Sequence, residues 1–553
     1  MIEIYCKNTG SRKKFPEGIS LLKMLDDFKF NHPFRIVSAK VNNVSKSLNF
    51  RAYNNLTVEF LDLRDPAAMR VYRRSLSFLL CKAAQDVFPK CHVYMEHPIS
   101  NGYFCNVRKA DRKKLSLGDV GAIRARMHEI VAEKMPFHRE DVPVDEAIKT
   151  FRKRGQLDKV KLLETSGTVY ADYYTLGDTP DFYYGRLVPD AGYLELWSLE
   201  PFHDGLLLRV PDRHNPKELA PFIDMPKTFS MFSENKKWNS IMHLNTVGDV
   251  NKACQMGRAS ELIQVAEALQ EKKIVQIAEE IEKRYRGRQK VRLVLITGPS
   301  SSGKSTVCKR LCVQLKACGL KPVSFSTDDY FVNRVNSPKF PDGSYDFDNF
   351  ETIDHDALQR DIELLLAGEE VEIPQYNFVT GIREYNGRKV RLGPGNILLV
   401  EGIHALNPRL SDKIPDARKY RIFISTMTGI SLDNHNVIPT SDNRLLRRII
   451  RDYNCGAFTA EQTINQWPKV RASEEVWINP YQENADVMFN SAYLIEFAVL
   501  RNHAEPILQS VPKNKPAYSE AHRLLKFIHY FTPVPDKEIP PTSLLRAFIG
   551  GGI

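Results

Sequence analysis

Gly298-Pro299-Ser300-Ser301-Ser302-Gly303-Lys304-Ser305-Thr306 is the stretch around which this chain is organised. It follows the apolar run 291–296 and precedes 307–315, which has the pattern of a helix. A strand, a loop bounded by glycines and a helix that begins at Lys-Ser form the setting that the pattern G-x-x-x-x-G-K-[ST] requires. Glycine lets the backbone approach a phosphate closely, and the amides of the loop and of the helix N-terminus can donate to its oxygens. The stretch therefore predicts a P-loop that binds a nucleoside triphosphate through these nine residues.

Two side chains of the loop have distinct predicted roles. Lys304 is placed to reach the outer phosphates, and the hydroxyl of Ser305 is placed to bind magnesium. The expected ligands are ATP and Mg²⁺.

Length and composition set the class of protein. A chain of 553 residues predicts about three to four domains. Its 42% hydrophobic and 26% charged residues are typical of a soluble globular protein, and no apolar run reaches the ~18 residues that span a bilayer. The start has no secretory pattern, so we expect a cytoplasmic protein without a membrane partner. Nine cysteines without a Cys-x-x-Cys pair predict neither a disulfide framework nor a zinc cluster.

Two acids follow apolar strands downstream of the loop. Asp328 lies just after the strand 322–326, and Glu401 ends the strand 396–401. Ligands of open α/β sheets bind at the carboxyl ends of the strands, so Asp328 is a candidate general base and Glu401 a candidate magnesium ligand. An Asp pair at a strand end is equally typical of a helix N-cap, and this alternative stays open for Asp328.

An arginine-rich helix is predicted over 442–452. Its arginines recur at i, i+3, i+4 and i+7, a spacing that places them on one face: Arg444, Arg447, Arg448 and Arg451. We expect this face to close as a lid and to neutralise phosphate charge, with Arg444 and Arg447 joining Lys304 and Asp328 as catalytic residues. The alternative is a solvated basic face paired with nearby acids.

These pieces occur in one order and resemble the uridine kinase and phosphoribulokinase family over 289–510. The resemblance also rests on Tyr-Asp-Phe-Asp348, on Pro-Gln-Tyr-Asn-Phe at 374–378 and on Val-Glu-Gly-Ile-His at 400–404. It implies an ATP-dependent kinase with a parallel sheet, in which the acceptor is bound by Asp348, Tyr376, Phe378, Arg383 and Gln466. Two positions depart from the nucleoside kinases: Gly381 stands where they carry a histidine, and Cys455 precedes Gly456 where they have arginine. The stretch that ends at His404 resembles the phosphoribulokinase version of this motif.

The first half resembles another family. The alternating strands 2–5 and 55–62 around a short helix resemble the ubiquitin-like (β-grasp) TGS domain, and 63–225 resembles the α+β editing-type second domain of threonyl-tRNA synthetase. That family's histidine and cysteine positions align here with Arg74, Phe78, Tyr183 and Leu187, none of which can bind a metal or transfer a proton as His and Cys do. We expect a domain without deacylase chemistry.

The complete prediction is an α/β chain with one catalytic centre. Its expected segments are a TGS module (1–62), a degenerate synthetase-like domain (63–225), a helical connector (226–288), a P-loop kinase domain (289–515) and a tail (516–553). The expected activity is transfer of the γ-phosphoryl of ATP to the 5′-hydroxyl of a nucleoside, most of all uridine. The alternatives are a sugar-phosphate or other metabolite kinase, and an RNA- or ribosome-associated nucleotide switch whose front domains contact RNA. A net charge of +11 allows anionic partners without selecting one, and the sequence does not indicate an oligomeric state.

Overall fold

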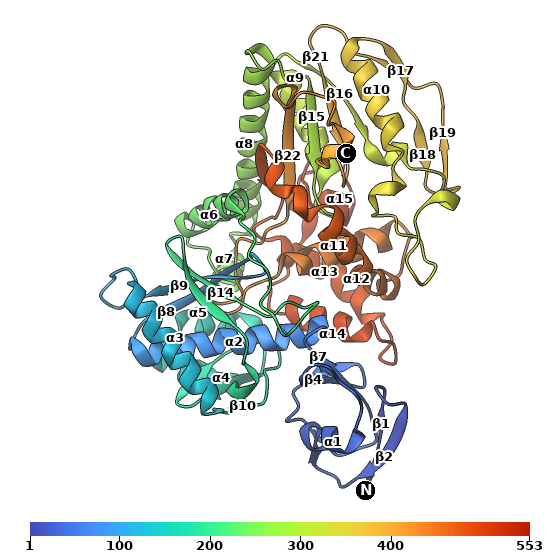
Figure 1. Cartoon of the computed structure of the whole chain (residues 1–553). Helices are drawn as coiled ribbons and strands as arrows, with labels where there is room; N and C mark the ends of the chain where they lie inside the picture. Colours follow the sequence, from blue (N-terminus) through green and yellow to red (C-terminus); the bar gives the residue numbers. More distant parts are fainter. Residues whose placement is uncertain (553) are drawn as a thin grey trace.

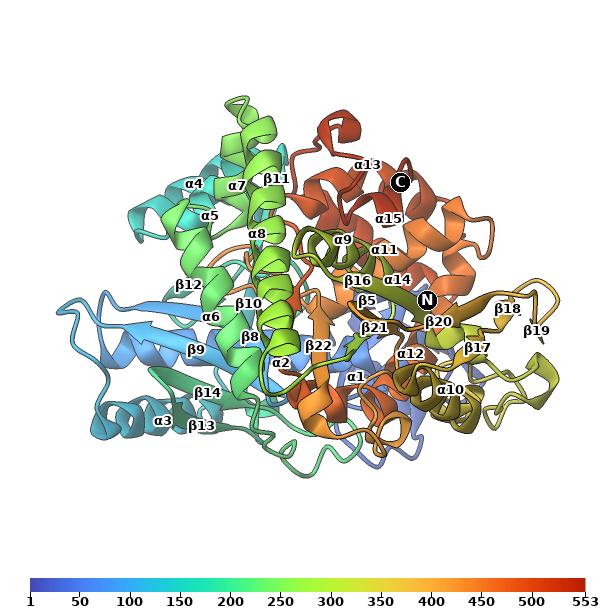
Figure 2. The same ribbon diagram turned by 90° about the horizontal axis from the view of Figure 1, so that it is seen from above.

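The computed structural model describes residues 1–552 and arranges them in three lobes (Figure 1). The N-terminal module lies at one end, the P-loop unit at the other, and the second domain lies beside them. Figure 2 shows the same arrangement from above, with the long helix α8 running along the P-loop unit.

The N-terminal module is a β-grasp unit. Its five-stranded sheet has the order β2-β1-β7-β4-β5, with β1 and β7 parallel at its centre. Helix α1 (Leu21–Phe28) starts at Ser20, whose side chain accepts from Lys23 N, and it buries Leu21, Met24 and Phe28 against the sheet. The strands are β1 (Ile2–Cys6), β2 (Ser11–Phe15), β3 (Ile19–Ser20), β4 (Ile36–Val41), β5 (Val44–Lys46), β6 (Arg51–Ala52) and β7 (Leu56–Asp62).

The second domain is α+β and antiparallel. The almost wholly buried helix α2 (Pro66–Val87) starts at the N-cap Asp65 and carries the core between two sheets, β13-β14-β9-β8 and β10-β11-β12. The strands are β8 (His92–Ile99), β9 (Gly102–Arg108), β10 (Phe137–Pro143), β11 (Tyr170–Leu176), β12 (Thr179–Asp181), β13 (Ser198–Phe202) and β14 (Gly205–Arg209). The other helices are α3 (Leu117–Ala132), α4 (Val144–Lys153) and α5 (Leu157–Ser166).

The connector consists of α6 (Pro226–Ile241), α7 (Val247–Gln255) and α8 (Ala259–Arg286). One face of α8 buries Ile274, Ile277 and Ile281 against the P-loop unit, as its helical periodicity predicts.

The P-loop unit is built on a parallel sheet of order β16-β21-β15-β22-β23. Its strands are β15 (Leu293–Thr297), β16 (Lys321–Ser326), β21 (Asn396–Glu401), β22 (Lys419–Ser425) and β23 (Val487–Asn490). Four short strands form two antiparallel pairs, β17 with β20 and β18 with β19. They are β17 (Glu370–Glu372), β18 (Gln375–Asn377), β19 (Ile382–Glu384) and β20 (Lys389–Arg391). The helices are α9 (Lys304–Ala317), α10 (His355–Ala367), α11 (Thr440–Asn454), α12 (Ala460–Trp477), α13 (Glu496–Gln509), α14 (Tyr518–Ile528) and α15 (Arg546–Ile549).

The hydrophobic core does not stop at the expected segment boundaries. One continuous cluster joins Phe151 and Leu162 of the second domain to Leu446, Phe497 and Phe527 of the C-terminal half. The last segment packs through α14 and α15, so it docks on the body of the molecule. The front and back halves are therefore fused through a shared core. Among residues 1–552, no helix combines the length and the apolar character that a membrane crossing needs.

Candidate functional site: a P-loop centre

The P-loop connects β15 to α9, as its sequence predicts. Gly298 has no room for a side chain, because a Cβ there would lie 2.4 Å from the carbonyl oxygen of Ile424. Gly303 has φ +89°, the left-handed region that favours glycine, and it directly precedes the helix. The amides of the loop and the first turn of α9 therefore line one concave surface at the carboxyl end of the sheet.

Ser305 and Glu401 meet across the sheet. The Ser305 hydroxyl donates to Glu401 Oε1 at 2.8 Å, because β15 and β21 are parallel neighbours and end at the same edge. A hydroxyl and a carboxylate are hard oxygen donors, the set that magnesium prefers. The donor set therefore fits the predicted metal.

Asp328 and Asp329 have separate functions at the end of β16. Asp329 Oδ2 accepts from Ser326 N and closes a capping box on the short 3₁₀ turn Thr327–Tyr330. Asp329 therefore takes the capping role expected of this Asp pair, and the assignment of Asp328 as general base stays a prediction. Burial and the charge of Glu401 together raise the pKa of Asp328 to about 7, against the opposing effect of Lys304.

Asp348 and Lys304 belong to the same charged group. Burial raises the pKa of Asp348 to about 6, against the opposing effect of Arg448. Burial also lowers the pKa of the Lys304 ammonium, although Glu401 and Asp328 act in the opposite direction. Carboxyls with raised pKa values around one lysine indicate buried charges that are not fully compensated, which is typical of sites that bind a ligand.

The approach of β16 to β21 requires one more glycine. A Cβ at Gly402 would lie 1.8 Å from the hydroxyl of Thr327, so only glycine fits beside the 3₁₀ turn that carries Asp328. His404, two residues further on, is 1% exposed, and burial lowers the pKa of its imidazole to about 4. His404 is thus a core side chain packed edge-on against Phe350.

The arginine helix, α11, differs from the expected lid. Arg444 and Arg447 are 2% and 0% exposed and form ion pairs with the buried carboxylates of Glu474 and Glu496. Both contact the P-loop: Arg444 Nε donates to Ser300 O at 2.9 Å, and Arg447 Nη1 donates to Ser301 O at 3.5 Å. Arg447 Nη1 also donates to Ser491 Oγ at 3.1 Å. A helix anchored by two buried ion pairs is held in place, because opening it would separate desolvated charges.

The other two arginines are more accessible. Arg448 donates to Ser300 Oγ at 3.0 Å, and Arg451 contacts Asp452 at 3.1 Å with 36% of its side chain exposed. The predicted contact of Arg448 and Arg451 with phosphate stays a hypothesis. Arg444 and Arg447 instead support the loop in this structure, and their catalytic role stays a prediction.

Ser491 and the two glutamates were not singled out from the sequence. Ser491 follows β23, and its hydroxyl donates to Ser302 O at 2.6 Å. Glu496 is the one acid in the apolar run 492–500, a pattern that indicates a buried, paired charge. That signal could have identified Glu496 and, with it, its partner Arg447.

The proposed acceptor residues surround a separate aromatic corner. Tyr376 is buried and Phe378 is 61% exposed, and both rings pack against Phe331 at 5.4 and 6.1 Å between centroids. Arg383 pairs with Asp354 at 2.8 Å, so its charge is already balanced. Gln466 lies half-buried on α12, beside Trp467.

The position that lacks the family histidine is filled from another loop. Gly381 has φ +74°, and a Cβ there would lie 2.8 Å from Cβ of Arg334 and 2.9 Å from its Nε. The Arg334 guanidinium donates to Phe378 O, and its Nε has no hydrogen-bond partner. No sequence pattern singles out Arg334, because only the fold brings it over Gly381.

A second buried cluster occupies the second domain, where the positions aligned with the synthetase site come together. Phe78 and Tyr183 pack at 5.4 Å between ring centroids, and with Leu187 they are fully buried. Arg74 donates to Arg186 O instead of facing a substrate. No open site is left among these four side chains.

The loop between β22 and α11 inserts beside this packing. His435 Nδ1 lies 2.7 Å from Asp181 Oδ2, and Lys159 Nζ lies 3.1 Å from Asp181 and 3.5 Å from Asp433. We call these four residues the junction cluster. Burial alone would raise the pKa of Asp181, but His435 and Lys159 outweigh it and lower the pKa to about 2.

The junction cluster could be mistaken for a metal site. Donor atoms of Cys81, Asp181 and His435 lie within 4.8 Å of one another. The ammonium of Lys159 already lies against Asp181 and provides the positive charge that a metal would supply. The cluster is therefore an ion-pair network that joins the two halves of the chain.

The parallel sheet, the P-loop and the strand-end acids define a P-loop kinase unit. Residues 293–494 match the model of the Phosphoribulokinase / Uridine kinase family. The uridine kinase of Mycoplasma genitalium is 30% identical over 197 residues, which cover 35% of this chain and 83% of that protein. For the uridine kinase of Mycoplasma pneumoniae the identity is 28% over 225 residues, covering 39% of this chain and 96% of that protein. The chain belongs to the phosphoribulokinase/uridine kinase family.

The N-terminal region matches a different group of proteins. The threonine–tRNA ligase of Methylococcus capsulatus is 29% identical over 192 residues, which cover 34% of this chain. The chain spans about 30% of the length of the threonine–tRNA ligases that it matches. The predicted resemblance of the front half to the synthetase editing region is confirmed.

Proposed function

We propose that the chain is an ATP- and magnesium-dependent kinase that phosphorylates the 5′-hydroxyl of a nucleoside such as uridine. The observation that carries the proposal is Asp328, a carboxyl with a pKa near 7 beside Lys304 and Glu401. A general base is most effective when its pKa lies near the working pH. The uridine kinases among the relatives support a nucleoside as the acceptor.

The proposed step transfers one phosphoryl group. Ionised Asp328 takes the proton as the acceptor O–H bond breaks, the acceptor oxygen bonds to the γ-phosphorus, and the bridging oxygen leaves with ADP. Lys304 and the loop amides hold the phosphates in place. Ser305 and Glu401 would hold magnesium, which when bound neutralises phosphate charge. Arg448 and Arg451 are placed to add positive charge.

Asp348, Tyr376 and Phe378 would bind the acceptor. Asp348 supplies a carboxylate for ribose hydroxyls, and the aromatic pair supplies a surface on which a base can stack. Gln466 is a further candidate for polar contact, whereas Arg383 would act through its ion pair with Asp354.

A second candidate is a kinase for a sugar phosphate or another small anionic metabolite. Arg334 favours it, because a guanidinium without a carboxylate partner lies over Gly381, where the nucleoside kinases have histidine. An anionic acceptor would pair with that charge.

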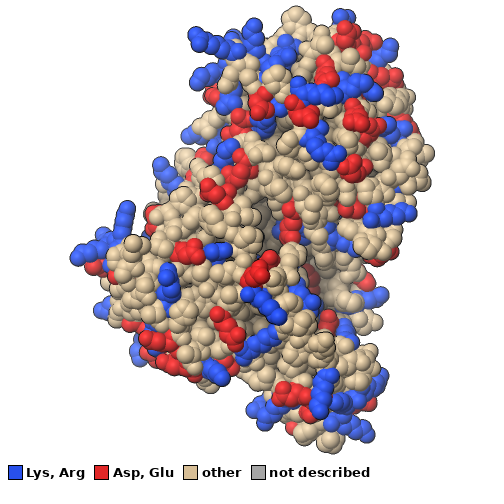
Figure 3. Space-filling model, viewed as in Figure 1, with Lys and Arg blue, Asp and Glu red and all other residues tan. Residues whose placement is uncertain are grey.

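A role as an RNA-associated nucleotide switch has less support. Lys and Arg are interspersed with Asp and Glu on the face shown in Figure 3, without one basic stripe. Retention of tRNA by the purified chain at low salt, and its loss at high salt, would support this role.

The decisive experiment is an acceptor screen with the full chain, labelled ATP and magnesium. Uridine, cytidine, ribulose 5-phosphate and pantothenate are compared, with Asp328→Ala as the control. Phosphorylation of uridine or cytidine that disappears in the variant, while nucleotide binding persists, is expected. Transfer only to the anionic acceptors would support the second candidate, and near-full turnover by Asp328→Ala would contradict the assignment of the base.

A further inference from the structure

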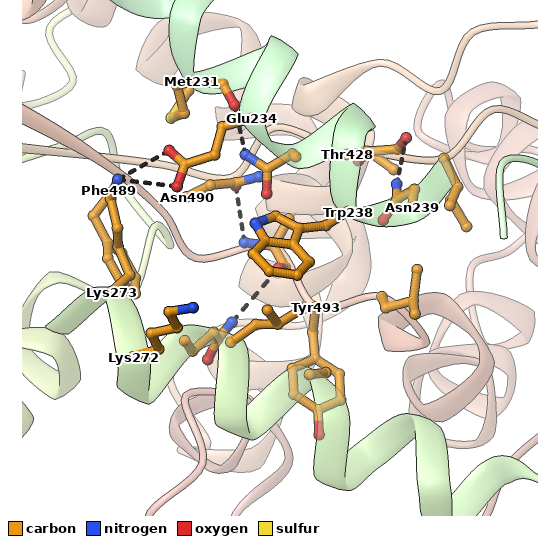
Figure 4. A pocket seen from close by; sticks show the side chains of 18 of the residues that line it. Met231, Glu234, Trp238, Asn239, Lys272, Lys273, Thr428, Phe489, Asn490 and Tyr493 are labelled. Atoms are coloured by element: carbon orange, nitrogen blue, oxygen red, sulfur yellow. Dashed lines mark hydrogen bonds and ion pairs between the residues drawn. The ribbon is translucent and has the colours of Figure 1, made fainter. Parts of the chain in front are cut away.

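A separate cavity of about 180 Å³ lies between α6, α8 and the loops after β22 and β23 (Figure 4). Trp238 and Asn239 come from α6, and Gln270, Lys272 and Lys273 from α8. Thr428, Gly429, Asn490 and Tyr493 also line the cavity. None of the P-loop residues lines this cavity, so it is distinct from the kinase site.

The floor of the cavity has hydrogen-bonding groups without partners. Gln270 is 6% exposed, and its Nε2 makes only long contacts, at 3.4 Å to Ser491 O and 3.5 Å to Ala492 O. Its Oε1 has no partner, and neither has the buried hydroxyl of Thr428. A buried acceptor without a donor is costly, so this geometry suits a ligand that brings an N–H or O–H group.

The wall and rim select a flat, negatively charged ligand. The indole of Trp238 stands at the centre of the view in Figure 4, and Lys272 Nζ lies 5.4 Å from the centre of its ring. Lys273 is paired with Glu234 at 2.9 Å. The charged side chains of the lining are two lysines and one glutamate, which leaves one positive charge, that of Lys272.

We propose that this cavity binds a planar heteroaromatic anion of the size of a nucleoside monophosphate. Its ring would lie against Trp238, a donor on the ring would reach Gln270 Oε1, and its anionic group would pair with Lys272. A ring with an attached phosphate combines the three features that the cavity can recognise.

Occupancy of the cavity would act on the P-loop through Ser491. Gln270 Nε2 contacts the carbonyl of Ser491, whose hydroxyl donates to Ser302 O of the loop. Arg447 donates to the same hydroxyl. A ligand that repositions the Gln270 amide therefore changes how Ser491 holds the loop, and we expect the affinity for ATP to change roughly fivefold or more.

The test is calorimetric titration of the full chain with its P-loop saturated by a non-hydrolysable ATP analogue. Uridine monophosphate, adenosine monophosphate and inorganic phosphate are the probes. At least one nucleoside monophosphate should bind. Trp238→Ala should weaken that binding by roughly 5- to 150-fold, the usual effect of losing one stacked ring. Gln264→Ala, an exposed position on α8, the helix that carries Gln270 and Lys272, should bind as the wild type does.

Further variants separate this cavity from the acceptor pocket and guard against misfolding. Phe378→Ala, in the acceptor corner, should leave the binding unchanged. Lys272→Ala and Thr428→Val should weaken it even if Trp238→Ala does not fold. The proposal is overturned if no nucleoside monophosphate binds or if phosphate alone binds equally well. It is also overturned if the cavity variants bind as the wild type does or if Phe378→Ala removes the binding. Binding without any change in ATP affinity would overturn the coupling through Ser491.

Discussion

The P-loop centre and the junction cluster both contain buried aspartates beside a lysine, but the pKa values of Asp328 and Asp181 are shifted in opposite directions. Around the loop, Asp328, Asp348 and Glu401 surround one lysine, and burial raises the pKa values of the two aspartates to about 7 and about 6. In the junction cluster, Lys159 and His435 neutralise Asp181, whose pKa is lowered to about 2. One centre is incomplete without a ligand, and the other completes itself.

This difference shows how to distinguish a working site from a structural one when both are buried and charged. Carboxyls held above their usual pKa are destabilising for the fold when they ionise, so their presence points to a ligand or a reaction. Carboxyls held below their usual pKa already have partners and stabilise the fold. Asp181 of the second domain belongs to the second kind.

Asp328→Asn should have the largest effect. Loss of the base should lower kcat by about 10²- to 10⁴-fold while ATP still binds. Labelled-ATP transfer and a separate nucleotide titration measure the two quantities. Asp329→Asn is the matched control, since Asp329 caps the turn, and it should retain most of the activity. Equal losses in the two variants would contradict the assignment of Asp328.

Lys159→Met should have the next largest effect, on folding. It leaves Asp433 buried without the Lys159 cation and Asp181 with His435 as its remaining partner, and it should cost about 3–5 kcal/mol of stability, measured by urea unfolding. Lys161→Met is the control. Lys161 is 43% exposed and pairs with Asp249, so the expected loss is about 0–1 kcal/mol. If Lys159→Met were as stable as the control, the junction cluster would not hold the halves together.

The two centres should also respond to acid at different pH values. As the proposed base, Asp328 would act only when ionised, so kcat/KM should fall about tenfold per pH unit below about 7. The depressed pKa of Asp181 means that its stabilising effect is full above about 4 and is lost as pH falls through about 2. Activity should therefore decline by pH 6 while far-UV circular dichroism is unchanged. Unfolding that accompanies the loss of activity would contradict the expectation that the two centres respond to acid at different pH values.

Phe378→Ala should have the smallest effect. The ring is 61% exposed, so its removal costs little stability, but a stacked base would lose about 1–3 kcal/mol of contact. We expect KM for the nucleoside to rise roughly tenfold, with the melting temperature unchanged. Val379→Ala, at a position 88% exposed, is the control. An unchanged KM would favour an acceptor without a base, as the second candidate requires.

Local sequence patterns predicted the elements of the P-loop unit closely. The helix after the loop begins at Lys304 and the second acid strand spans Asn396–Glu401, as expected from glycine spacing and apolar runs. Parallel strands end at one edge of the sheet, so the meeting of Ser305 and Glu401 also follows from the pattern. These features depend on neighbours in the chain, which a sequence displays directly.

The partners of buried charges could not be predicted in this way. Arginine spacing on α11 indicated one basic face, but Glu474 and Glu496 lie 30 and 49 residues away from Arg444 and Arg447. Only the packed fold shows that these two side chains support the loop.

The sequence by itself determined that this chain has a P-loop, strand-end acids and a synthetase-like front half without its histidines. The tertiary structure decided which charges remain available, because burial and pairing depend on segments that are distant along the chain. It placed Arg334 over Gly381, inserted His435 beside Asp181 and left Gln270 without a partner. Local sequence patterns identified the P-loop centre, and long-range packing determined which side chains surround it.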